Sequence, residues 1–168
     1  PNPVVTDIDC WLTKPDKSVL LRKQDVGLNF SATPNQYPTV QVDTTTTYQQ
    51  MDGFGFAMTG GSAYLINNLT AGTRNTLLNE LFANDQTSIG VSYLRVSIGA
   101  SDLSSTVFSY DDLSSGQTDI NLDHFDLGPD KVDLVPVLKS VLQINPGIKI
   151  LGSPWSAPVW MKNNKSAT

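Results

Sequence analysis

Four residues in the second half of the chain carry side chains suited to binding chemistry and lie in or near predicted strands: Arg95, Asp102, Trp155 and Trp160. A carboxylate accepts strong hydrogen bonds from hydroxyl donors. An indole ring offers a flat apolar surface together with one N–H donor. These properties suit a ligand that carries hydroxyl groups on an apolar frame, such as a sugar.

Each of these side chains also has a structural interpretation. Asp102 could instead close an Asx turn or cap a helix. Trp155 could pack against a strand or loop, and for Trp160 packing is favoured, with ligand contact as the alternative. Arg95 lies in an apolar strand, where a buried charge is costly unless it is paired. Pairing with carboxylates from later in the chain is favoured over an ordinary structural salt bridge.

The other titratable residues offer no obvious nucleophile or metal site. Glu80 is the only glutamate, and its place between Leu78 and Leu81 predicts a solvated helix surface. The sequence has one cysteine and one histidine, which excludes an internal disulfide and argues against a zinc site. A classical zinc site is therefore not expected. The remaining acids are assigned to structural turns, because their spacing is not that of an EF-hand: Asp111, Asp112, Asp119, Asp123 and Asp126.

Charge and composition narrow the class of partner. The chain of 168 residues has a formal net charge of −5 and no cluster of basic residues, so nucleic acid is not an expected partner. No apolar run is long enough to span a bilayer.

Two segments of different character must position these residues. Residues 1–47 are β-rich and irregular, with strands predicted over 4–12 and 39–43. From residue 48 the predicted elements are an extended segment over 51–58, a helix containing 77–82, a strand over 93–98, a helix starting near Asp130, and a strand over 149–152.

Alternating strands and helices predict a parallel sheet with right-handed crossovers, so the fold class is α/β. In such folds sites gather at the carboxyl ends of the strands. Gly53 and Gly55 lack the pattern of a nucleotide-binding loop and are expected to allow a close backbone approach. A closed eight-stranded barrel takes about 250 residues, so a barrel built from residues 48–168 would remain open.

Four motifs in register resemble glycoside hydrolase family 30 across Tyr48–Asn164. They are GFG at 53–55, YLRVSIGASD at 93–102, FSYDD at 108–112 and SPWSAPVWMK at 153–162. The resemblance implies a (β/α)8 TIM barrel packed against a side β-sandwich. By this resemblance, residues 1–47 supply strands of the sandwich, and residues 48–168 form the first three βα units of the barrel.

The resemblance also assigns roles to residues. Asp102 falls on a family position that binds sugar hydroxyls, Trp155 on one that lines the sugar subsite, and Arg95 on one that supports the catalytic carboxylates. The family's two catalytic glutamates lie on the fourth and seventh barrel strands, which are expected beyond residue 168. Gly60 stands where many glucosylceramidases have aspartate, which favours a β-1,6-glucanase.

The sequence therefore predicts the N-terminal part of a retaining β-glycoside hydrolase acting on a β-glucan, either a β-1,6-glucanase or a β-glucosidase/glucosylceramidase-like enzyme, inactive alone. No metal or organic cofactor is implied, because two carboxyl groups carry out this reaction. Its expected partners are that substrate and the remainder of the same protein. The start at Pro1 is typical of a processed or trimmed chain, and a secreted, periplasmic or cell-surface location is expected. The alternative is a non-catalytic carbohydrate-binding fragment, which would keep the contacts of Asp102 and the tryptophans.

Overall fold

The computed structural model describes residues 7–32, 34–85 and 87–167. The chain divides into two compact units, Pro1–Gln49 and Gln50–Thr168. Each is described by itself.

The described residues of the first unit include one short antiparallel pair of strands. β1 (Trp11–Leu12) pairs with β2 (Arg22–Lys23), and an isolated bridge joins Ile8 to Leu28. The Lys23 ammonium lies 5.2 Å from the centroid of the Trp11 ring and 2.9 Å from Asp9 Oδ1.

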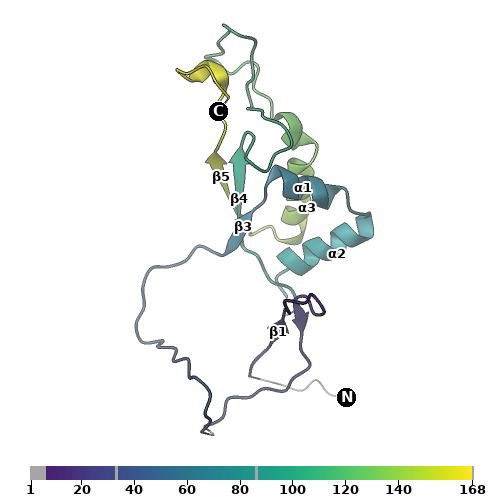
Figure 1. The fold of residues 1–168 in the computed structure, drawn as a ribbon, viewed down its shortest axis with the longest axis vertical. Helices are drawn as coiled ribbons and strands as arrows, with labels where there is room; N and C mark the ends of the chain where they lie inside the picture. The colour runs from purple at the N-terminus through teal and green to yellow at the C-terminus, as the bar shows by residue number, and fades with distance from the viewer. Residues whose placement is uncertain (1–6, 33, 86, 168) are drawn as a thin grey trace. The chain divides into compact units, whose positions relative to one another are not determined.

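The second unit is built on a three-stranded parallel sheet in the order β3-β4-β5 (Figure 1). β3 covers Gly55–Ala57, β4 Tyr93–Ile98 and β5 Lys149–Pro154. β3 approaches β4 so closely that a Cβ at Gly55 would lie 1.5 Å from the Tyr93 carbonyl oxygen. This close approach was predicted for Gly55, and it is a contact that only glycine permits.

Helices connect the strands and gather beside the sheet (Figure 1). α1 (Gly60–Asn67) and α2 (Ala71–Phe82) follow β3, and each is capped by a threonine side chain, Thr59 and Thr70. After β4 come the 3-10 helix η1 (Gly128–Lys131) and α3 (Leu134–Ile144), and η2 (Val159–Met161) follows β5. Among the described helices, none is long and apolar enough to cross a membrane.

The hydrophobic core lies between the helices and one face of the sheet. Leu94 from β4 is fully buried and belongs to one cluster with Phe82 of α2 and Val137 and Val141 of α3. On the opposite face, Gly55, Ala57 and Leu151 are exposed and Arg95 is half-buried. The helices therefore leave the Arg95 face of the sheet open to solvent in the part of the chain that the structure describes.

Several boundaries differ from the sequence-based expectation. The strand predicted over 39–43 does not form, because extended propensity makes a strand only where a partner completes the ladder. Of the strand predicted over 4–12, residues 4–6 lie outside the described residues, and β1 covers only Trp11–Leu12. The helix predicted near Asp130 begins as η1 and continues as α3, with Pro136 in its first turn, where a missing N–H costs little.

Candidate functional site at the strand ends

Arg95, in the middle of β4, and Trp155, which follows the carboxyl end of β5, are in side-chain contact. Arg95 pairs in register with Leu151, so Ser153, two residues further along β5, lies on the same face of the sheet. The Arg95 guanidinium donates to Ser153 Oγ from Nη2 at 3.2 Å, and its central carbon lies 5.0 Å from the centroid of the Trp155 ring. That distance is within the range of a cation–π interaction.

No carboxylate within the described residues forms the predicted ion pair with Arg95. Its contacts there are a hydroxyl group and an aromatic ring. A half-buried guanidinium with these neighbours retains N–H donors that could bind a carboxylate.

The Trp155 side chain is 49% exposed and borders a hollow of about 270 Å³. Tyr110 and Phe125 of the loop after β4 line the same hollow, together with Met161 of η2. The walls are mostly apolar and aromatic, which suits the C–H face of a sugar ring.

Backbone hydrogen bonds fix the segment that carries Trp155. The N–H groups of Trp155 and Ser156 donate to Ile98 O at 3.2 and 3.3 Å, and Ser156 Oγ donates to Ala100 O at 2.7 Å. Gly99 has φ +79°, and a Cβ there would lie 2.7 Å from Ser156 O. The close crossing of the two strand ends therefore requires glycine at this position.

Asp102 lies in the turn after β4, and its carboxylate does not hold that turn. Ser101 N–H donates to Ser104 Oγ at 3.0 Å, and Leu103 N–H donates to Ser101 Oγ at 3.2 Å. The Asp102 side chain is exposed, and no hydrogen bond or ion pair engages it within the described residues. The Asx-turn and helix-cap interpretations therefore find no support here, and the carboxylate is free to accept from a ligand.

Asp102 borders a different hollow from the one beside Trp155. This second hollow has a volume of about 580 Å³, and its other walls come from α1, from Phe108 and from Asp130 of η1. The structure thus brings Arg95 and Trp155 into contact but does not bring Asp102 into that pair. Asp102 and Trp155 nevertheless both follow the carboxyl ends of their strands, β4 and β5, whereas Arg95 lies in the middle of β4.

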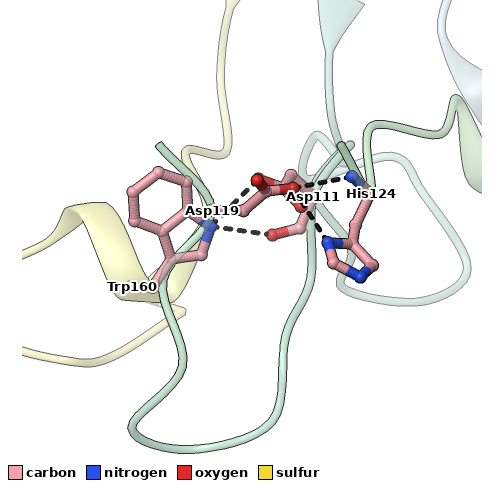
Figure 2. A network of polar contacts seen from close by, with 4 residues as sticks. All are labelled: Asp111, Asp119, His124 and Trp160. Atoms are coloured by element: carbon pink, nitrogen blue, oxygen red, sulfur yellow. Dashed lines mark hydrogen bonds and ion pairs between the residues drawn. The ribbon is translucent and has the colours of Figure 1, made fainter. Parts of the chain in front are cut away.

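Trp160 is half-buried, and its indole is bound by Asp111, one of the acids predicted to lie in structural turns (Figure 2). Its indole N–H donates to both the backbone oxygen and the Oδ2 atom of Asp111, each at 3.1 Å. Asp111 is only 3% exposed, and its Oδ1 atom is buried without a partner among the described residues. These contacts favour the packing interpretation of Trp160.

Beside this pair, Asp119 binds His124 (Figure 2). The Asp119 Oδ2 atom accepts from the His124 backbone N–H at 2.6 Å and lies 3.0 Å from the ring Nδ1. Burial works to raise the pKa of Asp119, but the hydrogen bonds from the His124 and Asp123 backbones and the His124 ring outweigh it and lower the pKa. No group of three potential metal ligands occurs in the described parts of the chain.

Tyr110 and Asp130 connect the loop after β4 to η1. The Tyr110 hydroxyl donates to Asp130 Oδ2 at 2.6 Å. Burial, with this hydrogen bond and the Asp130 charge, raises the pKa of Tyr110 to about 12. Burial also raises the pKa of Asp130. Glu80, by contrast, is exposed on α2, as predicted.

A parallel sheet with helical crossovers defines an α/β unit, with polar groups at its strand ends. Residues 51–168 match the glycosyl hydrolase family 30 TIM-barrel domain. The chain therefore belongs to glycosyl hydrolase family 30, as the sequence motifs predicted.

Curated relatives agree with this assignment. The chain is 40% identical over 121 residues to the endo-1,6-beta-D-glucanase of Neurospora crassa, covering 70% of this chain and 24% of the relative. It is 37% identical over 140 residues to the endo-1,6-beta-D-glucanase BGN16.3 of Trichoderma harzianum, covering 82% of this chain and 28% of the relative. The chain thus spans about a quarter of the length of these relatives.

Solved structures agree as well. The endo-beta1,6-glucanase BT3312 superposes with a TM-score of 0.73 at 34% identity, over 94% of this chain and 32% of that one. SrfJ from Salmonella typhimurium superposes with a TM-score of 0.63 at 30% identity, over 70% of this chain and 25% of that one. The structural likeness supports the α/β barrel units of residues 50–168; a side β-sandwich is not confirmed.

Proposed function

We propose that this chain is the N-terminal part of a retaining β-glycoside hydrolase that cleaves a β-glucan, with β-1,6-glucan as the preferred substrate. The observation that carries the proposal is the contact of Arg95 in β4 with Trp155 after β5 in a family 30 unit. We infer the β-1,6 linkage of the substrate from the similarity of this chain to relatives named as endo-1,6-beta-D-glucanases.

The chemistry of retention requires two carboxyl groups about 5–5.5 Å apart across the scissile bond. Glu80 is the only glutamate of the sequence, and it is exposed on the surface of α2. We therefore assign both catalytic glutamates to protein beyond residue 168, so the chain alone is inactive.

The chain supplies binding and support instead. In this proposal Asp102 accepts hydrogen bonds from sugar hydroxyls, and the exposed ring of Trp155 packs against the sugar. Arg95, which has no carboxylate partner within the described residues, pairs with a catalytic carboxylate and holds it ionised. Trp160 positions η2 rather than touching the sugar. A polymeric substrate that cannot cross a membrane implies action outside the cytoplasm.

The test compares the complete protein with the 168-residue chain on β-1,6-glucan. The expected result is hydrolysis by the complete protein, with the β-anomer as the first product in an NMR time course, and none by the chain alone. Hydrolysis by the isolated chain, or release of the α-anomer first, would contradict the proposal.

The second candidate is a non-catalytic carbohydrate-binding module. It is favoured by the exposed Trp155 ring and the unpartnered Asp102 carboxylate in a chain with no glutamate at a strand end. Titration of the isolated chain with gluco-oligosaccharides, followed by tryptophan fluorescence, separates the two candidates. Saturable binding by the isolated chain supports the module, and its absence supports the hydrolase.

A further inference from the structure

The segment after β5 is tied at both of its ends to β4 and to the loop that follows β4. At its start, the Trp155 N–H donates to Ile98 O at 3.2 Å. At its other end, the Trp160 indole donates to the backbone oxygen and to Oδ2 of Asp111, each at 3.1 Å (Figure 2). Because Trp155 and Trp160 belong to the same short segment, the second tie restricts the backbone that carries the Trp155 ring.

The loop fixes the position of Asp111 independently of Trp160. The Asp111 N–H donates to Ser109 Oγ at 3.3 Å. Asp112 in turn accepts from the N–H and from the hydroxyl of Ser109, at 2.7 and 2.6 Å. These bonds close a compact turn, so the Asp111 carboxylate is a preformed acceptor for the indole of the neighbouring segment.

The burial of Asp111 costs stability. The residue is only 3% exposed, and its Oδ1 atom is buried without a partner among the described residues. A buried carboxylate oxygen that lacks a donor is unfavourable. Natural proteins keep such unfavourable groups mainly at or near functional sites. Asp111 fits that pattern, because it lines the same hollow as Trp155.

The Trp155 side chain, by contrast, has few contacts of its own. Its ring is 49% exposed, and its indole N–H has no hydrogen-bond partner within the described residues. Its ring contact there is the Arg95 guanidinium at 5.0 Å. The direction of the ring therefore depends on its backbone. An aromatic ring contributes to sugar binding only when its face meets the C–H groups of the sugar, so a displaced backbone lowers affinity.

We propose that Asp111 is a positioning residue, which holds the segment after β5 through the Trp160 indole so that the Trp155 ring faces the sugar. The proposal rests on the proposed function, because it gives Asp111 a supporting role in that enzyme. Asp111 acts through Trp160 and touches no substrate. A purely structural role would lower stability and leave the KM of the folded protein unchanged, whereas a positioning role changes KM.

The test uses three variants of the complete protein at this contact. Asp111→Ala removes the side-chain acceptor, and Trp160→Phe removes the indole donor. Asp111→Asn keeps a side-chain carbonyl oxygen that accepts from the indole, so it is the conservative variant expected to restore function. Asp119→Ala is the matched control, because Asp119 is a 6% exposed aspartate of the same loop that lies 3.0 Å from the His124 ring instead.

The readout is KM and kcat on β-1,6-gluco-oligosaccharides, measured well below the unfolding temperature of each variant. A displaced Trp155 ring weakens the bound substrate and the transition state equally. We therefore expect Asp111→Ala and Trp160→Phe each to raise KM about tenfold and to change kcat by less than about twofold. The double variant raises KM no further, because both substitutions break one contact.

Asp111→Asn and Asp119→Ala are expected to keep the KM of the parent protein, although Asp119→Ala lowers the unfolding temperature. An unchanged KM in Asp111→Ala would overturn the positioning role and leave the hydrolase proposal standing. An equal rise of KM in Asp119→Ala would do the same, because any disturbance of the loop would then suffice. If Asp111→Ala does not fold, Trp160→Phe decides by the same criterion. A parent protein that cleaves no β-glucan would overturn the hydrolase proposal, and the positioning role with it.

Discussion

The central carbon of the Arg95 guanidinium lies 5.0 Å from the centroid of the Trp155 ring, which joins the middle of β4 to the residue that follows β5. This contact places a permanent positive charge beside the aromatic side chain proposed to bind the sugar. A similar pair occurs in the N-terminal unit, where Lys23 lies 5.2 Å from the centroid of Trp11. The two pairs differ in the cation and in its surroundings.

We expect the Arg95–Trp155 pair to show a measurable coupling free energy. A double-mutant cycle with Arg95→Met and Trp155→Leu, followed by urea unfolding, is expected to give about 1 kcal/mol. Arginine is the more weakly hydrated cation, and Arg95 is half-buried. The control cycle with Lys23→Met and Trp11→Leu is therefore expected to give less. A larger coupling in the Lys23 cycle would contradict this ranking.

Asp102→Asn separates binding from folding. Because no described group depends on the Asp102 carboxylate, we expect the unfolding free energy to change by less than about 0.5 kcal/mol. Glucan hydrolysis by the complete protein is expected to fall about 10- to 100-fold, because a charged acceptor for sugar hydroxyls is lost.

Ser104→Ala is the matched control for Asp102→Asn. Ser104 Oγ accepts from the Ser101 N–H in the same turn, so this variant is expected to lose about 1 kcal/mol of stability. Unchanged hydrolysis with Asp102→Asn would remove this carboxylate from the binding site.

Trp160→Phe tests the contact between η2 and the loop after β4. The substitution leaves two Asp111 oxygen atoms without their shared donor in a residue that is 3% exposed. We expect a loss of about 1–3 kcal/mol of unfolding free energy in urea denaturation. Trp155→Phe, which removes an indole N–H from a half-exposed ring, is expected to cost less than about 0.5 kcal/mol. Equal losses of unfolding free energy in Trp160→Phe and Trp155→Phe would show that the hydrogen bonds from the Trp160 indole to Asp111 contribute little to stability.

Periodicity predicted the parallel part of the fold well. YLRVSI at 93–98 became β4 with the same bounds, because β-branched and aromatic residues there meet partners on both sides. α1 was not predicted, because GGSAYLIN begins with two residues of poor helix propensity and has a weak apolar pattern. Its Thr59 cap and the burial of Ala63 and Ile66 stabilise it in context.

The strand-end location of the candidate residues could be predicted, but most of their partners could not. The contact of Arg95 with Ser153 depends on the register of β4 against β5, which a strand pattern alone does not fix. The bond between Trp160 and Asp111 depends on the path of an irregular loop, for which the sequence has no periodic signal. The sequence predicts a structural turn at Asp111, and the structure adds a contact that the sequence does not reveal: Asp111 accepts a hydrogen bond from the Trp160 indole.

Asp119→Asn tests the acid sensitivity of the loop after β4. Hydrogen bonds from His124 and Asp123 outweigh burial and hold the pKa of Asp119 below its ordinary value of 3.8. A carboxyl group with a lowered pKa in the folded state adds stability above the unfolded-state value, and this contribution is lost as pH falls through the folded-state value. We therefore expect the wild-type protein to lose stability below about pH 3.8 more steeply than the Asn variant, as measured by unfolding temperature against pH.

Asp123→Asn, which removes an exposed carboxylate from the same loop, is expected to retain the steep wild-type dependence. If Asp119→Asn and Asp123→Asn flatten the pH profile equally, the Asp119–His124 contact does not lower the pKa of Asp119.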